Sequence, residues 1–386
     1  MDPGTVLEQG QMVSPEQLPG DDSASNDWQP AYVLYGGAQL FSAETHDKML
    51  ALARKWLKEY AWLNDTQKKR VEKRLAQPLD DLRIDFEDGY GRRPDEEEDA
   101  HALKVQQALP QVHEPRRCGI RIKPVTRRFA QRGIRTLEIA LKNLTVWPRG
   151  FCVTLPKLED PTQVQYVIQE LERIENGRPP LPLELMIESP AGLRRIHELI
   201  QAAGPRARGV HFGPFDFLAS CGIGNGDLLH PVNRQARAQL LMSVSGSGVE
   251  LADGPTTLLP LPPHRQPSGP QIAENQKSVR LAWEFHRDQV LATREQGYFQ
   301  SWLLHPAQLV SHAAALLQEY EQALPGALER LTAYWQGRGQ ARASGGDFDD
   351  RATARQWTHI VKQSLDLGLI EESSLRQSLP PDWQQV

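Results

Sequence analysis

Cysteine is scarce in this chain of 386 residues, which has only Cys118, Cys152 and Cys221. An odd number of widely spaced cysteines favours neither a disulfide framework nor a zinc cluster. We expect the three side chains to fill core positions, and the expected location is a reducing cytoplasm.

Long apolar runs and an excess of one charge are also missing. No apolar run approaches the ~20 residues that span a bilayer, so no transmembrane helix is expected. The 44 basic and 49 acidic residues leave a net charge of −5. This balance predicts neither a nucleic-acid partner nor an anionic membrane partner. Residues 1–30 lack the basic start and apolar core of a signal peptide and are predicted to be a disordered lead.

What the chain does have is a repeating pattern of a short apolar run, a polar or small cluster and a helical segment. Continuous rather than alternating apolar runs are typical of parallel strands that are covered on both faces. Eight such alternations predict an α/β fold, the (β/α)₈ barrel. A doubly wound open sheet is the alternative, although the first turn has no G-x-G-x-x-G. The eight runs are residues 31–37, 82–89, 119–124, 151–159, 183–190, 209–217, 248–254 and 301–306.

The barrel is predicted to occupy residues 31–324, with two additions. A helical insertion follows the first helix at 64–81, and residues 325–386 form a C-terminal helical extension that serves as a lid or an oligomer contact. The Pro-rich segment 260–274 is predicted to be a long loop on the catalytic side of the seventh strand.

Polar side chains gather where the predicted strands end, which is where such barrels build their sites. Carboxylates dominate this set, and only one histidine is present. Oxygen donors with few histidines indicate Mg²⁺, or Mn²⁺, and Glu188 and Asp216 on adjacent strands suit the ligand role. The residues at the strand ends are Asp85, Glu87, Asp88, Arg121, Lys123, Lys157, Glu159, Glu188, Asp216, Asp253 and His305.

Several of these residues have a plainer interpretation. Arg121 lies inside an apolar run, where an unpaired cation is costly, so it could form a barrel-filling ion pair with Asp85 or Glu87. Asp88 could cap the helix after Gly89, and His305 could make only a structural contact.

Six motifs in order resemble the citrate lyase β-subunit-like family, also called the HpcH/HpaI aldolase family, of the phosphoenolpyruvate/pyruvate-binding barrels. They are "IDFEDG" (84–89), "IRIKP" (120–124), "TLPKLEDPTQV" (154–164), "LMIESPAGL" (185–193), "VHFGPFDF" (210–217) and "LLHPAQL" (303–309). The chain departs from the pattern at 64–81, in its C-terminal extension, in the "YGGAQLFSAE" turn and in the loop after the seventh strand.

The resemblance implies roles for the residues at the strand ends. Arg121 would hold the carboxylate and enolate oxygen of a pyruvate-like or acyl-like substrate, and Glu188 and Asp216 would bind Mg²⁺. The carboxylates of Asp85, Glu87 and Asp88 would hydrogen-bond waters on the metal and brace Arg121. The remaining implied roles are substrate contact by the amides of Gly213, Pro214 and Phe215, and support of the site by Lys157 and His305.

The function that we expect is a Mg²⁺-dependent carbon–carbon lyase or aldolase of a small oxo- or hydroxy-acid. A metal and a fixed guanidinium would stabilise the enolate, whereas a Schiff base on Lys123 or Lys157 is a less economical route. The alternatives are an acyl-coenzyme A lyase, synthase or thioesterase, and a non-catalytic metabolite-binding barrel. The resemblance also implies a homo-oligomer.

Overall fold

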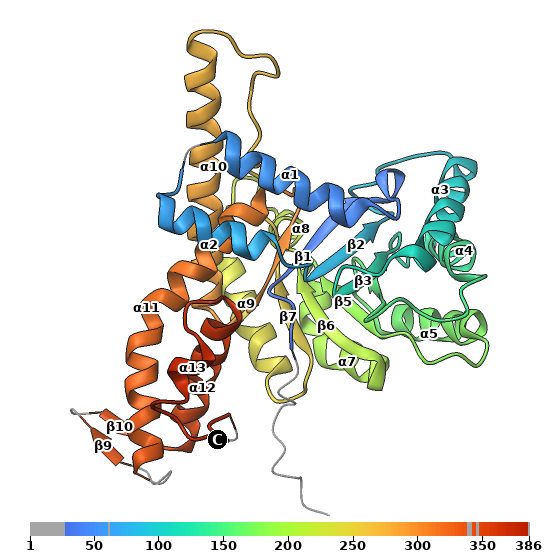
Figure 1. Cartoon of the computed structure of the whole chain (residues 1–386). Helices are drawn as coiled ribbons and strands as arrows, with labels where there is room; N and C mark the ends of the chain where they lie inside the picture. The colour runs from blue at the N-terminus through green and yellow to red at the C-terminus, as the bar shows by residue number, and fades with distance from the viewer. Residues whose placement is uncertain (1–27, 61, 338–341, 345–346, 385–386) are drawn as a thin grey trace, which may run out of the picture.

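Eight parallel strands close into a barrel in chain order, with β8 hydrogen-bonded back to β1 (Figure 1). This computed structural model describes residues 28–60, 62–337, 342–344 and 347–384. The predicted (β/α)₈ barrel and its eight strands are confirmed. The strands are β1 (Tyr32–Gly37), β2 (Asp81–Asp85), β3 (Arg117–Arg121), β4 (Cys152–Leu155), β5 (Leu183–Ile187), β6 (Ala207–Phe212), β7 (Glu250–Asp253) and β8 (Gln300–Leu303).

Helices surround the barrel, and further helices follow it in the C-terminal part of the chain. The predicted insertion is the second helix, which packs against the first and the eleventh. The helices are α1 (Thr45–Glu59), α2 (Asp65–Leu75), α3 (Asp95–Ala108), α4 (Ala130–Leu141), α5 (Pro161–Glu175), α6 (Pro190–Arg194), α7 (Ile196–Ala203), α8 (Pro214–Ser220), α9 (Pro231–Val244), α10 (Pro270–Arg294), α11 (Gln308–Gln336), α12 (Arg351–Asp366) and α13 (Glu372–Leu375). A two-stranded hairpin, β9 (Arg342–Ser344) and β10 (Asp347–Asp349), precedes α12.

Local sequence signals explain where two of these helices begin. The Asp160 side chain accepts the Thr162 N–H at the start of α5, and Pro161 occupies the first helical position. Ser189 does the same for the Gly192 N–H at the start of α6. These caps satisfy N–H groups that have no partner within their own helix. Both helices therefore start directly after the strand ends that carry Lys157 and Glu188.

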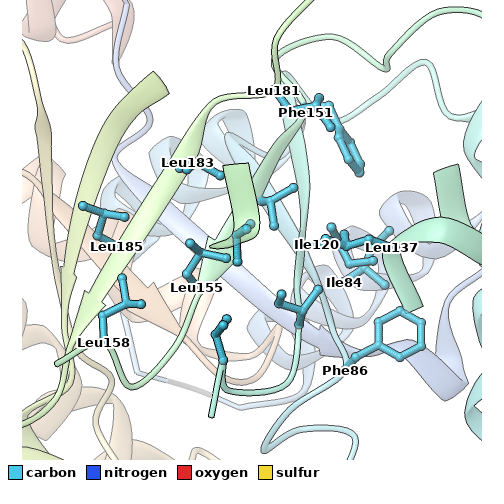
Figure 2. Packing of buried hydrophobic residues seen from close by; sticks show 14 of the residues in the cluster. Ile84, Phe86, Ile120, Leu137, Phe151, Leu155, Leu158, Leu181, Leu183 and Leu185 are labelled. Carbon is cyan, nitrogen blue, oxygen red and sulfur yellow. The ribbon is translucent and has the colours of Figure 1, made fainter. Parts of the chain in front are cut away.

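The main core lies between the strands and the helices outside them. Figure 2 shows Ile84 and Ile120 from two adjacent strands packed near Leu137 of α4. Leu155 and Leu185 belong to the same buried cluster on β4 and β5. Both faces of each strand are buried, but the strand sequences are not continuously apolar as expected: in β2, Leu82 and Ile84 alternate with Asp81, Arg83 and Asp85.

The barrel interior, by contrast, holds a buried ionic network. The Arg83 guanidinium donates to Asp81 and to Glu184, at 2.9 Å in each case. Glu184 also accepts from the Thr154 hydroxyl at 2.7 Å. A Cβ at Gly119 would lie 1.8 Å from the Arg83 guanidinium, so only glycine fits there. This network fills the barrel beneath the strand ends where the site is built.

Three details differ from the sequence-based expectations. Helix α10 begins at Pro270, so the predicted loop 260–274 ends at residue 269, because proline favours the first turn of a helix. Helix α11 runs unbroken through the predicted boundary at 324, with Pro325 inside it. Cys221 is exposed rather than in the core, while the other two cysteines are buried.

The C-terminal extension packs on the outside of the barrel. Helix α12 lies along α11, and its residues Gln363 and Asp366 line a cavity with Ala31 and Asp80, at the amino ends of β1 and β2. Its roles as a lid or an oligomer contact stay predictions. Of the predicted lead, residues 1–27 lie outside the described residues, and Trp28 lies over Arg116 and Arg117. Among the described helices, none combines the length and the apolar character that crossing a bilayer requires.

The seam between α10 and α11 contains a buried histidine. His286 Nδ1 lies 2.7 Å from the Ser311 hydroxyl, and the Trp283 indole donates to the Ala307 carbonyl. Burial lowers the pKa of His286 to about 3. The folded protein therefore binds fewer protons here than the unfolded chain, whose histidine pKa is about 6.5. Stability from this group is present above pH ~6.5 and is lost as the pH falls towards 3.

We predict that replacing His286 with Gln makes the protein less sensitive to acid. Between pH 7 and 5 the free energy of unfolding of the wild type should fall by about 2 kcal/mol more than that of His286→Gln. Urea unfolding at several pH values measures this difference. At pH 8 histidine is neutral in both states, so the difference there isolates the packing change. Parallel pH profiles for the two proteins would contradict the prediction.

Candidate active site

A cavity of about 680 Å³ opens at the carboxyl ends of the strands. The residues that line it come from the ends of β1, β2, β3, β5, β6, β7 and β8 and from helix α1, and none belongs to the described part of the extension after residue 324. Most of the predicted site residues lie in its wall: Asp85, Asp88, Arg121, Glu188, Gly213, Pro214, Phe215, Asp216 and His305.

Asp85 and Arg121 form the floor of the cavity. They end neighbouring strands and are paired in register. The Arg121 guanidinium donates to both oxygens of Asp85, at 2.6 and 2.5 Å, and lies 3.2 Å from Glu87. Both side chains of the Asp85–Arg121 pair are almost fully buried. The ion pair and the bracing predicted for Asp85 and Glu87 are therefore present, whereas Asp88 points towards Lys157.

The backbone after β2 folds around the Asp85 carboxylate. The N–H groups of Glu87 and Gly89 donate to its two oxygens, at 2.9 and 2.7 Å. A Cβ at Gly89 would lie 2.6 Å from the carboxylate, so this position requires glycine. With two amide and two guanidinium donors, the buried carboxylate is fully compensated. Burial alone would lower the pKa of Arg121, but the Asp85 carboxylate raises it above its usual value.

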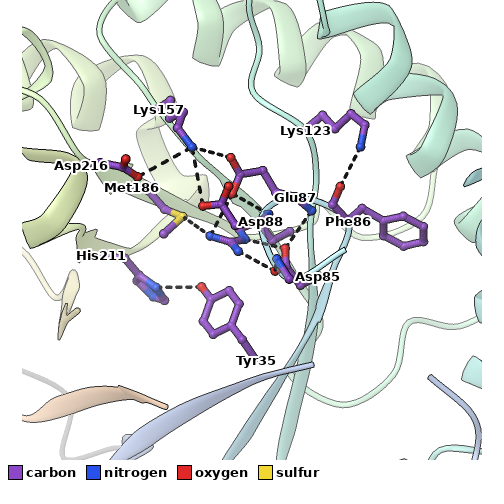
Figure 3. Close-up of polar contacts among 12 residues, drawn as sticks. Tyr35, Asp85, Phe86, Glu87, Asp88, Lys123, Lys157, Met186, His211 and Asp216 are labelled. Carbon is purple, nitrogen blue, oxygen red and sulfur yellow. Dashed lines mark hydrogen bonds and ion pairs between the residues drawn. The ribbon is translucent and has the colours of Figure 1, made fainter. Parts of the chain in front are cut away.

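Two aromatic rings, whose centroids are 4.5 Å apart, pack against each other and against the guanidinium. The centre of the Arg121 guanidinium lies 4.8 Å from the Tyr35 ring and 5.2 Å from the Trp302 ring. The Tyr35 hydroxyl lies 3.3 Å from Nδ1 of His211, as Figure 3 shows. Cation–π contact in a desolvated site is worth ~2 kcal/mol. Neither ring was predicted to belong to the site, although Tyr35 and Trp302 lie in the first and eighth predicted strands.

Glu188 follows β5 and is buried beside Gly213. A Cβ on Gly213 would lie 2.7 Å from the Glu188 Oε1 atom, so glycine lets the carboxylate lie against the backbone. The Lys157 backbone N–H donates to its other oxygen at 2.8 Å. Burial raises the pKa of Glu188 to about 7, opposed by Lys157 and Arg121. The charged form is thus under-compensated by the protein's own groups.

Lys157 lies among the carboxylates. Its ammonium is 2.5 Å from Glu87, 3.7 Å from Asp88 and 3.8 Å from Asp216 (Figure 3). Its backbone is left-handed, with φ of 54°. In this conformation the Lys157 N–H donates to Glu188 while the ammonium contacts Glu87. Burial opposes the charge, but the carboxylates of Glu188 and Glu87 raise the pKa of Lys157. A protonated lysine is a poor Schiff-base nucleophile, so the imine alternative finds no support at Lys157.

The segment 213–216 offers fewer free backbone N–H groups to a substrate than predicted. The Gly213 N–H donates to the Ile187 carbonyl at 3.0 Å, and Pro214 has no N–H. Of the three predicted amides, Phe215 has its N–H in the first turn of α8, where no intrahelical partner exists. Asp216 is half exposed and faces the cavity.

Other polar residues at the strand ends lie outside the cavity wall. Lys123 pairs with Glu98 at 2.9 Å, and Asp253 pairs with Arg237 at 2.9 Å. Both bonds tie a strand end to a surrounding helix. Glu159 is exposed and does not line the cavity. His305 lines it, and its Nδ1 accepts the Ala307 N–H at 3.1 Å, so it both borders the site and caps the following turn.

The donor set fits a hard divalent ion. Within the described residues no three His, Cys, Asp or Glu side chains are arranged to hold a metal by themselves. Glu188 and Asp216 offer two carboxylates beside an open cavity, and Mg²⁺ typically takes one or two carboxylates with water and substrate. The under-compensated charge of Glu188, near the half-exposed carboxylate of Asp216, suits a cation held by these two carboxylates.

Solved structures share this fold. A citrate lyase from Burkholderia xenovorans LB400 is 20% identical, covers 92% of this chain and 96% of its own, and superposes with a TM-score of 0.64. Protein CitE from Mycobacterium tuberculosis, in complex with magnesium, acetoacetate and coenzyme A, is 18% identical over 87% of this chain and 98% of its own, with a TM-score of 0.55.

A curated relative matches part of the sequence. L-malyl-CoA/β-methylmalyl-CoA lyase of Cereibacter sphaeroides is 29% identical over 157 residues, which are 39% of this chain and 46% of the relative. The match thus spans about half of the relative's length. Together these neighbours confirm the predicted resemblance to the citrate lyase β-like group.

One family covers nearly the whole chain. Its model, described as a domain of unknown function, DUF6986, matches residues 7–386. The chain is a member of the DUF6986 family.

Proposed function

We propose that this protein is a Mg²⁺-dependent carbon–carbon lyase or aldolase that acts on a small oxo- or hydroxy-acid. The observation that carries the proposal is Arg121, a buried guanidinium held rigidly in the cavity floor beside Glu188 and Asp216. Cleaving or forming a bond next to a carbonyl develops enolate charge, and fixed cationic donors stabilise such charge as it forms. The magnesium complex of the structurally similar CitE supports the choice of metal.

The charges of the site favour binding of a dication. Five carboxylates, those of Asp85, Glu87, Asp88, Glu188 and Asp216, share two cationic side chains, Arg121 and Lys157. Carboxylates so close together repel one another unless cations compensate them. A bound Mg²⁺ would remove most of the excess negative charge.

Each residue then has a distinct task. Asp85, Tyr35 and Trp302 fix the plane of Arg121, whose remaining N–H groups can donate to a substrate carboxylate and enolate oxygen. Glu188 and Asp216 would hold Mg²⁺, which acts as a Lewis acid on the substrate carbonyl when bound. Lys157 keeps Glu87 paired, so that Glu87 stays a bracing group for Arg121.

An acyl-coenzyme A lyase is the second candidate. The partial match to a malyl-CoA lyase and the coenzyme A in the CitE complex favour it. Calorimetric titration with acetyl-coenzyme A and with pyruvate, each with Mg²⁺, separates the two functions. Metal-dependent binding of the thioester alone would move the protein to this second candidate.

We predict that Glu188→Gln and Asp216→Asn each weaken Mg²⁺ binding by more than about 100-fold, because lost supporting contacts alone cost 10–100-fold at metal sites. Folding should survive, since Gln removes a charge whose burial is unfavourable. Calorimetry with Mg²⁺ or Mn²⁺ and circular dichroism measure the two effects. The matched control is Glu159→Gln, at an exposed strand-end carboxylate outside the cavity. Unfolded variants would instead make these carboxylates structural.

We predict that Arg121→Lys keeps Mg²⁺ binding and lowers kcat/KM by about 100-fold or more. Lysine cannot reproduce the two-pronged contact with Asp85 or present a planar group to the two rings. Metal titration and steady-state kinetics on the same preparation test this. Unchanged turnover would contradict the role assigned to Arg121.

A further inference from the structure

A second cavity lies at the opposite end of the barrel from the candidate active site. It measures about 330 Å³ and is lined by Ala31, Asp80 and Arg116, which directly precede β1, β2 and β3. Gln363 and Asp366 line it from α12. The cavity therefore lies where the C-terminal extension meets the barrel, and it shares no lining residue with the active-site cavity.

The lining of this second cavity is mainly polar. Three glutamines, Gln29, Gln77 and Gln363, share the wall with two arginines and two aspartates. A glutamine amide both donates and accepts hydrogen bonds. An apolar molecule would remove these groups from water without replacing their hydrogen bonds, which is costly. The lining therefore favours a polar ligand.

One arginine and one aspartate of the cavity satisfy each other. The Arg74 guanidinium donates to Asp80 at 2.6 Å, and the other oxygen of Asp80 accepts the Ala31 N–H at 3.0 Å. Both side chains of this ion pair are largely buried. The pair is neutral as a unit, so the charge offered to a ligand comes from the remaining two residues, Arg116 and Asp366.

Arg116 has an aromatic neighbour in place of an acidic one. The centre of its guanidinium lies 5.0 Å from the Trp28 ring, and no ion pair or hydrogen bond joins its side chain to another described residue. Trp28 is itself held by Arg117, which lies 5.5 Å from the ring and donates to the Trp28 carbonyl at 3.4 Å. The ring orients the Arg116 guanidinium without neutralising it, so its N–H groups are available to an anionic group.

Asp366 is the carboxylate that remains. It is the last residue of α12, where the helix dipole disfavours an anion and favours a cation. Desolvation by the surrounding chain raises its pKa, although Arg116, Arg74 and Lys362 act in the opposite direction. None of these cations is in an ion pair with it within the described part of the chain. Because Asp366 is exposed, a ligand can reach it.

We propose that this cavity binds a free α-amino acid with a polar, uncharged side chain. Its carboxylate would accept from Arg116, its ammonium would donate to Asp366, and the glutamine amides would satisfy its side chain. A dicarboxylate would place a negative group against Asp366, and a diamine would place a positive group against Arg116. The volume is at the lower end of the about 300–1,000 Å³ of ligand pockets, which suits a molecule of this size.

The first test is calorimetric titration of the full chain with L-glutamine and L-serine, without Mg²⁺. N-acetyl-L-glutamine lacks the ammonium and L-glutaminamide lacks the carboxylate, so each should bind at least about tenfold more weakly than L-glutamine. Glutarate, with two carboxylates, should not compete. Failure of both amino acids to bind, or equal binding of any of these three comparison compounds, would overturn the inference. Neither result bears on the proposed function, which concerns the other cavity.

Two variants and their matched controls test the location. Arg116→Gln and Asp366→Asn should each weaken L-glutamine binding by about tenfold or more. Folding should tolerate both changes because neither side chain is in an ion pair, and circular dichroism checks this. The controls Arg149→Gln and Asp382→Asn change exposed residues outside the cavity and should keep the wild-type affinity. Wild-type affinity in the first two variants would overturn the assignment to this cavity.

Hydrogen exchange tests a consequence of the geometry. Arg116 belongs to the barrel and Asp366 to the extension, so a ligand that contacts both fastens α12 to the barrel and stabilises the docked form. With saturating L-glutamine, the backbone N–H groups of α12 should exchange about tenfold more slowly or less. Those of α4, which lines neither cavity, should keep their rates. Unchanged exchange in α12 despite binding would contradict a ligand held between these two residues.

Discussion

The bidentate contact between Asp85 and Arg121 is the interaction on which the site depends. It joins the ends of β2 and β3, and the same carboxylate organises the following turn through the amides of Glu87 and Gly89. The aspartate thus orients a strand, a loop and a guanidinium at once. Because the pair is buried, losing either partner would leave an uncompensated charge, which typically costs 3–5 kcal/mol.

Around this pair, some residues are tightly packed and others face the open cavity. Tyr35 and Trp302 pack against the guanidinium, and the buried network of Arg83, Asp81 and Glu184 fills the barrel below. Asp216, in contrast, is half exposed beside the cavity. Binding groups are placed by packed strands, while the residues that would exchange ligands face open space. This division is typical of sites built on a rigid scaffold.

Much of the fold and part of the site could be predicted from the sequence. Eight apolar runs were sufficient for the barrel, and ends of neighbouring strands brought Asp85 and Arg121 together. The prediction failed on the direction in which the side chains at the strand ends point. Lys123 and Asp253 also end strands, yet they pair with the helix residues Glu98 and Arg237. Treating each strand as one continuous apolar run left unassigned which polar side chains point into the barrel, although in β2 polar and apolar residues alternate.

The same limit explains why Tyr35 and Trp302 were missed, since a ring in an apolar run predicts burial and not a partner. The Gly213 N–H is unavailable to a substrate because it donates to the Ile187 carbonyl, across the ends of two strands. This is a tertiary contact that has no local sequence signal. The helix starts at Pro161 and Pro190, in contrast, have a local signal, because caps depend on adjacent residues alone.

The left-handed backbone at Lys157 has a consequence for sequence variation. A non-glycine residue in this conformation costs about 1–2 kcal/mol, so the backbone by itself favours glycine or asparagine. The ammonium among the carboxylates favours lysine. The backbone preference and the electrostatic preference therefore oppose each other at this one position. In homologues that have lost the activity, we expect glycine to replace this lysine before the barrel itself changes.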